Sequence, residues 1–278
     1  MNPRRSEQGN QWINMNNSIK SESGIDLLQR LAVRPKLSGL QVEIFGRNGP
    51  LPGDIIEINE RGSCGKTLLL TQWIIKCILP SKWKEFTING LNVGVVLIST
   101  DHHFMILHLV TLMERRLKRI LRCQPGTGSA VVQEIIQDSL KRFSVFMSFS
   151  KSQLLFNFCS VKTYILSHPH SSVVVVDSLT AYYWEDRLMA NIQSFEKYCS
   201  VLLKNLMEKL KQTNITIIYT TQLFLRENQE KDPELVNPYV YSLLLEKNPD
   251  FTVSVEDRRN ATTTVKKVEM FKGELIFK

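Results

Sequence analysis

Val173 to Val176 form an uninterrupted run of valines that leads directly into Asp177. A strand with one solvent-exposed face alternates apolar and polar residues, whereas a strand buried on both faces shows no such alternation. The valine run is therefore typical of a central strand in a parallel sheet that carries helices on both faces. It predicts an α/β fold for this chain of 278 residues.

Apolar periodicity elsewhere supports the same architecture, because it switches repeatedly between strand and helix spacing. Strands are predicted at 53–58, 93–99, 143–147, 172–177 and 214–220. Helices are predicted at 66–79, 104–121, 130–142, 151–167 and 191–212. After Thr221 the pattern changes, and two segments alternate with a period of two, as antiparallel edge strands do: 251–255 and 265–278. We expect one core domain over 53–278, preceded by a disordered tail at 1–20 and a short helix and loop at 21–52.

The composition limits the class of protein. Hydrophobic residues make up 43% of the chain and charged residues 22%, as in globular domains. No run of about 18 uncharged apolar residues occurs, so no membrane partner is expected. The five cysteines are scattered without a C-x-x-C pair, which indicates reduced thiols. A net charge of +8 permits a polyanionic partner such as DNA but does not establish one.

Gly65-Lys66-Thr67 stands between a predicted strand and a predicted helix, as in a phosphate-binding loop. In such loops backbone amides surround the phosphates, a lysine neutralises their charge, and a threonine hydroxyl ligates Mg²⁺. Asp177, at the carboxyl end of its strand, is expected to share that Mg²⁺ with Thr67. The residues expected to bind ATP are Gly62, Ser63, Cys64, Gly65, Lys66 and Thr67.

The first glycine of the full loop pattern is absent, and Glu60 stands in its place. Glutamate does not adopt left-handed backbone as freely as glycine. Its carboxylate would also repel a triphosphate by about 1–4 kcal/mol at close range. Gly62 could relax the loop, and Arg61 could pair with Glu60 or with a phosphate. Two outcomes stay open: a loop that tolerates Glu60 and binds ATP, and a loop that keeps its shape but binds nucleotide poorly.

Two polar residues at the ends of predicted strands are candidates for catalysis. Asp101 follows the strand at 93–99, where a base that activates water would lie. A helix N-cap for the helix that begins at residue 104 is an equally good interpretation of Asp101. Gln222 follows the strand at 214–220, where its side chain could sense the terminal phosphate.

The order of these segments resembles the core of the RecA-type recombinases. The string from Asp177 to Arg187, with aromatic residues at Tyr182-Tyr183-Trp184, more narrowly resembles the recombinase paralogues. Three further segments carry the same resemblance, which covers about residues 20–225: Glu22 to Leu31, Cys77 to Pro80 and Ser167 to Pro169. It implies a RecA-like core, a nuclear location and a role in homologous recombination. It also implies a hetero-oligomeric complex with other paralogues, through which the chain reaches DNA.

Recombinases of this kind form filaments by inserting a Phe-x-x-Ala linker into the next subunit. None of the phenylalanines in this chain is followed by alanine at that spacing. The resemblance therefore implies a subunit that accepts such a linker but does not donate one. The two segments expected to contact DNA, 180–197 and 223–237, each carry a net negative charge, so strong DNA binding through them is not expected.

Three functions follow from these residues. The favoured one is a subunit that does not form filaments and acts through its protein contacts, with a degenerate or regulatory nucleotide site. The alternative is an ATP-hydrolysing subunit that remodels the complex on DNA, with Asp101 as base and Gln222 as sensor. A small-molecule P-loop kinase is less favoured, because the acidic segment 223–237 does not suit an arginine-rich lid.

None of these functions accounts for a cluster of basic residues near the end of one predicted helix. The predicted helix at 104–121 and the residue after it carry five basic residues close together: Arg115, Arg116, Lys118, Arg119 and Arg122. Cations near a helix C-terminus are favourable, so a solvated face explains them. A contact with DNA or with an acidic partner is the other interpretation.

Overall fold

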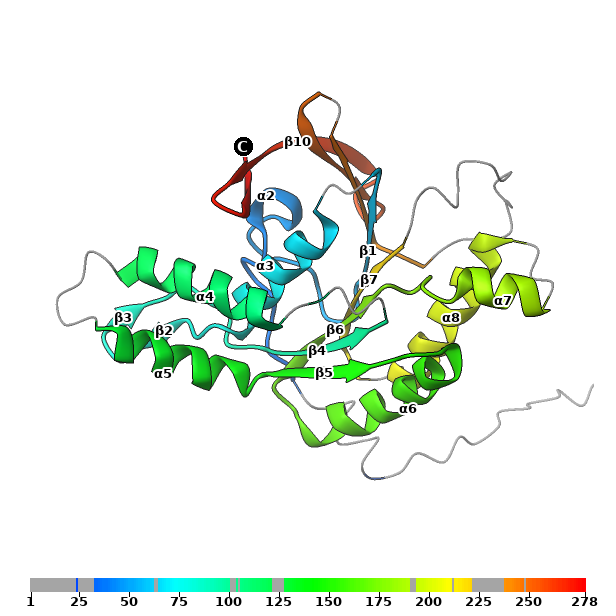
Figure 1. The fold of residues 1–278 in the computed structure, drawn as a ribbon, viewed down its shortest axis with the longest axis horizontal. Coiled ribbons are helices and arrows are strands. Elements are labelled where there is room, and N and C mark those ends of the chain that lie inside the picture. The colour runs from blue at the N-terminus through cyan, green and yellow to red at the C-terminus, as the bar shows by residue number, and fades with distance from the viewer. Residues whose placement is uncertain are drawn as a thin grey trace, which may run out of the picture.

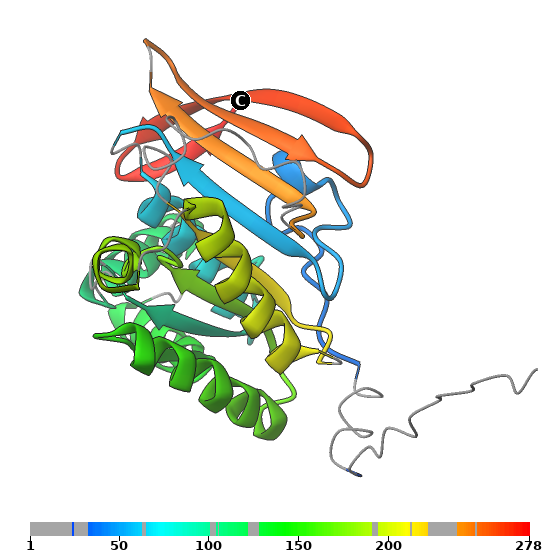
Figure 2. The ribbon, with the colours of Figure 1, turned by 90° about the vertical axis from the view of Figure 1, so that its right-hand side faces the viewer.

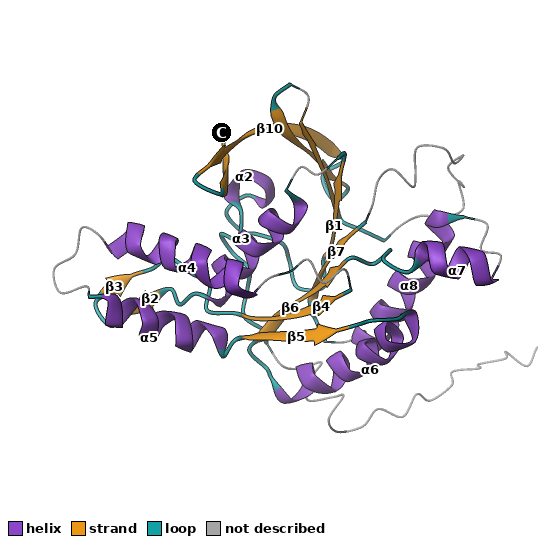
Figure 3. Ribbon diagram, viewed as in Figure 1, coloured by secondary structure: helices purple, strands orange, loops and turns teal. Residues whose placement is uncertain are grey.

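The computed structural model describes residues 24, 33–62, 65–100, 104, 106–121, 128–190, 194–211, 213–221, 238–247 and 249–278. Within these ranges nine strands form one sheet, in the order β11-β10-β9-β8-β1-β7-β6-β4-β5 (Figures 1 and 3). Its parallel strands are β1 (Ile55–Glu60), β4 (Gly94–Ser99), β5 (Phe143–Met147), β6 (Ser171–Asp177), β7 (Thr216–Thr220) and β8 (Tyr241–Lys247). Its antiparallel strands are β9 (Phe251–Asp257), β10 (Thr262–Phe271) and β11 (Glu274–Phe277). The predicted α/β fold, with antiparallel strands at its C-terminal edge, is confirmed.

Helices lie on both faces of the parallel strands (Figure 1). They are α2 (Val42–Phe45), α3 (Lys66–Ile78), α4 (Ile106–Leu121), α5 (Ser129–Leu140), α6 (Lys151–Ser167), α7 (Tyr183–Ala190) and α8 (Phe195–Leu210). Val173 and Val175 join the hydrophobic core beneath α3, α4 and α5. Val174 and Val176 join the second core, beneath α6 and α8. The valine run is buried on both sides because each face of the sheet has its own core.

Local sequence explains several helix starts. Ser150 caps α6, since its hydroxyl accepts a hydrogen bond of 3.3 Å from the amide of Gln153. Ser194 caps α8 in the same way, with a bond of 3.4 Å from the amide of Lys197. The bounds of β5 and α6 are those that periodicity predicts.

Three elements differ from the sequence prediction. The segment expected to be a DNA-contacting loop after Asp177 contains α7. The stretch before residue 251 contains β8, which pairs parallel with β1. A small hairpin of β2 (Lys82–Trp83) and β3 (Phe86–Thr87) follows α3. The expected tail at 1–20 lies outside the described residues, as does most of the start of the segment at 21–52, where the short helix is expected.

The C-terminal strands curve over α3 (Figure 2). Gln72 of α3 donates to the carbonyl of Leu275 at 3.3 Å and accepts from the amide of Leu275 at 3.1 Å. The side-chain amide thus satisfies the backbone of β11 as a neighbouring strand would. This contact fixes β11 against the helix that carries the candidate site.

Arg34 anchors the segment before the core at the amino-terminal ends of β6 and β7. Its side chain is 4% exposed and donates to the carbonyls of Thr213 at 2.5 Å and Ser171 at 2.8 Å. Longer contacts of 3.4–3.5 Å reach three further carbonyls near the end of α6: Ile165, His168 and Pro169. Burial lowers the pKa of the guanidinium. Several carbonyl dipoles, including those of the helix end, compensate the buried charge.

Candidate functional site

The candidate residues gather where the parallel strands end. In open α/β sheets ligands bind outside the carboxyl ends of the strands. The loop of Gly65-Lys66-Thr67 follows the end of β1, and Asp177 is the last residue of β6. Between these two strands lies β7, whose last residues contact both. The sheet order therefore brings the predicted loop and the predicted carboxylate to one edge.

The loop has the backbone expected of a tight strand-to-helix turn. Gly62 has φ of 71°, and Gly65 has φ of 103° at the N-cap position of α3. Residues other than glycine rarely adopt these conformations. Ser63 and Cys64, which we expected to bind phosphate, lie outside the described residues. Thr67 lies in the first turn of α3, where its carbonyl accepts from the hydroxyl of Thr71 at 2.7 Å.

Glu60 fills the role that a bound phosphate would have in this loop. One of its carboxylate oxygens accepts from the backbone amide of Lys66 at 3.1 Å. The other lies 3.6 Å from the Lys66 ammonium, whose side chain is only 7% exposed. A helix N-terminus and a buried lysine are the two groups that hold phosphate in loops of this kind. Here an internal carboxylate engages both.

The end of β7 joins the loop to β6. The Lys66 ammonium donates to the carbonyl of Thr221 at 3.3 Å. The hydroxyl of Thr220 donates to the Asp177 carboxylate at 2.7 Å, and that carboxylate is buried. The hydroxyl of Thr221 donates to Asn59 at the end of β1. Asn59 is a buried polar residue of this edge that the sequence does not reveal, because a single asparagine before a loop carries no distinctive pattern.

The end of β4 is tied to the end of β6. The hydroxyl of Thr100 donates to the carbonyl of Ser178 at 2.7 Å and accepts from the amide of Ser178 at 2.6 Å. The peptide bond between Asp177 and Ser178 is cis. Asp101 and Gln222, the two candidate catalytic residues, lie outside the described residues. The residues that precede them, Thr100 and Thr221, are both at this edge.

In the described part of the loop, Glu60 competes with a triphosphate for the same donors. The amide of Lys66 and the Lys66 ammonium already have an anionic partner in Glu60. A phosphate placed at the same donors would meet a carboxylate at close range, and like charges at such distances repel. Asp177 is hydrogen-bonded to Thr220, which leaves its role toward Mg²⁺ a prediction.

The described residues also bear on metal binding and on membrane insertion. Among the described residues, no group of three or more His, Cys, Asp or Glu side chains is arranged to hold a metal ion. None of the helices in the described ranges is both long and apolar enough to cross a membrane.

The parallel sheet, the Gly65-Lys66-Thr67 loop after β1 and the aspartate that ends β6 define a RecA-like protein of the P-loop class. The crystal structure of the RadB recombinase has the same fold. The two structures agree with a TM-score of 0.58 over 85% of this chain and 96% of RadB, at 20% sequence identity.

Sequence comparison gives the family. The DNA repair protein XRCC2 of Mus musculus is 31% identical over 217 residues, which are 76% of this chain and 71% of the mouse protein. The XRCC2 homolog of Arabidopsis thaliana is 25% identical over 187 residues, 58% of this chain and 50% of the plant protein. No family model matches the sequence. The chain belongs to the XRCC2 family of RecA-type recombinase paralogues.

Proposed function

We propose that the chain is a recombinase-paralogue subunit that does not form filaments and supports homologous recombination repair of DNA double-strand breaks. It acts in the nucleus, assembled with other paralogues, and reaches DNA through that assembly. Membership of the XRCC2 family supports the role in repair, because the mouse relative is named as a DNA repair protein. The absence of a Phe-x-x-Ala linker in the sequence supports a subunit that does not extend a filament.

The contact between Glu60 and Lys66 carries the proposal that the nucleotide site is degenerate. The carboxylate supplies the negative charge that Lys66 and the start of α3 need, so the loop is stable without a phosphate. A subunit with such a loop contributes its surface to the complex, and nucleotide turnover is slow or absent.

The open edge of the sheet is the surface that suits a partner's extended linker. Among the described residues, β5 is the last strand on that side of the sheet. Beside it, Met147 is 44% exposed, Phe149 67% and Phe156 70%. An extended segment of another paralogue could pair with the free side of β5 and place apolar side chains against these residues.

One pair of variants tests whether partner binding is separate from the loop. We expect Lys66→Ala to co-purify with its paralogue partner as the wild type does, because the Lys66 side chain is buried and points into the loop. Phe156→Ser should reduce co-purification severalfold, because an exposed aromatic side chain beside a partner-binding edge carries much of the binding free energy. The measurement is the yield of each recombinase paralogue after co-expression with the tagged full chain.

The reverse pattern contradicts the proposal. If Lys66→Ala loses the partner while Phe156→Ser retains it, assembly depends on the nucleotide loop and the role of the open edge is wrong. Circular dichroism and thermal unfolding of both variants control for misfolding.

ATP hydrolysis in the assembled complex is the second candidate. The contacts of Lys66 and Asp177 with the end of β7 support it, because they keep both side chains at one edge of the sheet. Turnover would require Glu60 to release Lys66, Asp101 to act as base and Gln222 to act as sensor. In that case Lys66→Ala and Asp101→Asn both abolish phosphate release by the assembled complex. Phosphate release that persists in either variant excludes this function.

A further inference from the structure

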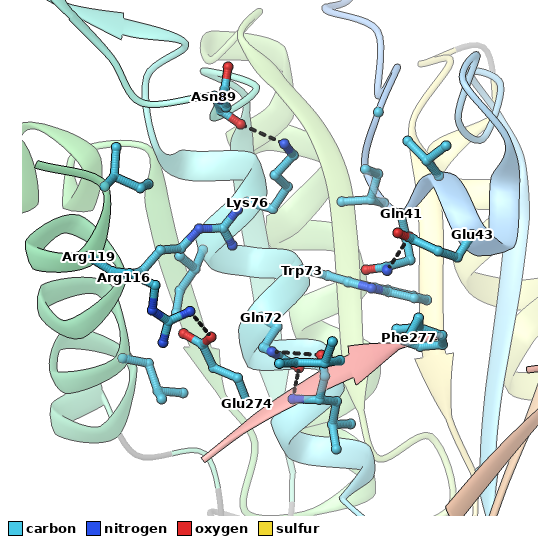
Figure 4. A pocket seen from close by; sticks show the side chains of 18 of the residues that line it. Gln41, Glu43, Gln72, Trp73, Lys76, Asn89, Arg116, Arg119, Glu274 and Phe277 are labelled. Atoms are coloured by element: carbon cyan, nitrogen blue, oxygen red, sulfur yellow. Dashed lines mark hydrogen bonds and ion pairs between the residues drawn. The ribbon is translucent and has the colours of Figure 1, made fainter. Parts of the chain in front are cut away.

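A cavity of about 510 Å³ lies between α3, α4 and β11, away from the phosphate loop. The segment around α2 closes its remaining side (Figure 4). Its volume is within the range of small-molecule binding sites. The charged and aromatic side chains in its wall are Glu43, Trp73, Lys76, Arg116, Arg119, Glu274 and Phe277.

The cavity contains more positive charge than its own carboxylates neutralise. Arg119 pairs with Glu274 at 2.7 Å. The Lys76 ammonium donates to the carbonyl of Asn89 at 2.6 Å, which leaves its charge without a carboxylate in direct contact among the described residues. Arg116 has no hydrogen bond or ion pair within the described part of the chain, although it is only partly exposed.

Burial and mutual repulsion act on these cations together. Burial lowers the pKa of Lys76, and the positive charge of Arg116 lowers it further, against smaller attractions from Cys77 and Glu43. Burial also lowers the pKa of Arg116, against a smaller attraction from Glu274. Two neighbouring cations held partly out of water destabilise a fold unless an anion compensates them. Proteins keep such arrangements mainly where they serve function.

The opposite side of the cavity carries two aromatic side chains beside the polar pair of Gln41 and Glu43. Figure 4 shows Trp73 and Phe277 on the side of α2, across from Arg116 and Arg119 of α4. Trp73 is 2% exposed and its indole nitrogen has no partner among the described residues. A matching ligand has a flat apolar body to pack against the aromatic side chains and an anionic group to pair with the basic side chains.

We propose that this cavity is a second anion-binding site, which takes a small aromatic phosphate or carboxylate. Arg116 and Lys76 bind the anionic group, and Trp73 with Phe277 packs against the apolar body. The site is independent of the phosphate loop, because Lys66 and Glu60 do not line it.

The direct test measures binding of 1-naphthyl phosphate to the full chain by calorimetry, with 1-naphthoate and neutral 1-naphthol as matched probes. We expect the phosphate or the carboxylate to bind at least about tenfold more tightly than naphthol, since charge-assisted hydrogen bonds favour the anion. Comparison of the two anionic probes shows which anionic group the site prefers. Equal binding of naphthol would overturn the proposal.

Variants assign the binding to the cavity. Arg116→Met and Lys76→Met should each lower the binding affinity for the anionic probe about tenfold or more. Lys118→Met is the matched control on α4: Lys118 pairs with Glu114 and does not line the cavity, so affinity should not change. Lys66→Ala should also leave the probe affinity unchanged. An affinity that depends on Lys66 but not on Arg116 would place the probe in the phosphate loop and overturn the proposal.

Stability without the probe gives a second readout. Arg116→Met should raise the unfolding midpoint by about 2 to 4 °C, because it removes a partly buried cation that lacks an ion pair among the described residues. A fall in the midpoint would show that Arg116 is structural and would contradict a binding role. A single-stranded oligonucleotide that competes with the probe and shows the same dependence on Arg116 would replace the small-molecule site with a nucleic-acid contact.

Discussion

Glu60→Gly is expected to raise the affinity of the chain for Mg-ATP by about 5- to 1000-fold. The range corresponds to removing about 1–4 kcal/mol of repulsion between the carboxylate and a triphosphate. The substitution also frees the amide and the ammonium of Lys66, which Glu60 engages at 3.1 and 3.6 Å. Calorimetry on the full chain in complex with its paralogue partner measures the change directly.

Two controls make the result specific to the loop. Glu85→Gly removes an exposed carboxylate from the turn between β2 and β3 and should leave affinity unchanged. Adding Lys66→Ala to Glu60→Gly should abolish the gained affinity, because the phosphates lose their cation. Micromolar binding by the wild type that Glu60→Gly does not improve would show that Glu60 leaves the loop when nucleotide enters, and the degenerate-site proposal would be wrong.

Arg34→Ala is expected to lower the free energy of unfolding by about 3 kcal/mol or more. It removes hydrogen bonds of 2.5 and 2.8 Å from a buried guanidinium and leaves the carbonyls of Thr213 and Ser171 without that donor. Hydrogen bonds to charged groups contribute about 1.5–3 kcal/mol, and an unsatisfied buried carbonyl costs about 1–3 kcal/mol. Urea unfolding measures the loss as a lower midpoint with an unchanged slope.

A matched arginine in the same segment separates this effect from a general loss of charge. Arg47 is exposed, so Arg47→Ala should change stability by less than about 0.5 kcal/mol. Arg34→Lys should recover only part of the loss, because an ammonium cannot reproduce the planar fork that reaches several carbonyls. An Arg34→Ala protein that unfolds at the wild-type urea concentration would show that the segment is not anchored by this side chain.

Much of the fold could be predicted because its determinants are local. The bounds of β5 and α6 follow from apolar spacing and from the capping serine at residue 150. The position of Asp177 follows from the valine run, whose two faces enter two different cores. The sheet order at the loop could not be read from spacing, because β8 joins β1 through backbone pairing between distant segments.

The site was predicted in part. The sequence indicated the loop and the conflict created by Glu60, and it offered Arg61 as a partner for that carboxylate or for a phosphate. In the structure Arg61 pairs with Glu246 of β8 at 2.7 Å, and Glu60 pairs with Lys66. The partner of Arg61 could not be predicted because β8, which carries Glu246, comes from a distant part of the chain. Two basic residues of α4 differ for the same reason: both line the cavity, but β11 supplies Glu274 as an ion-pair partner for Arg119 and not for Arg116.

The pairing of β1 also affects how the chain folds during its synthesis on the ribosome. Ile55 pairs with Ile217 of β7, and Ile56 pairs with Tyr241 of β8, so both neighbours of β1 are synthesised long after it. Contacts between such distant segments form slowly, and apolar strands without their neighbours are prone to aggregate. The phosphate loop is therefore completed late, and we expect the nascent chain to need chaperones most between the synthesis of α3 and that of β8.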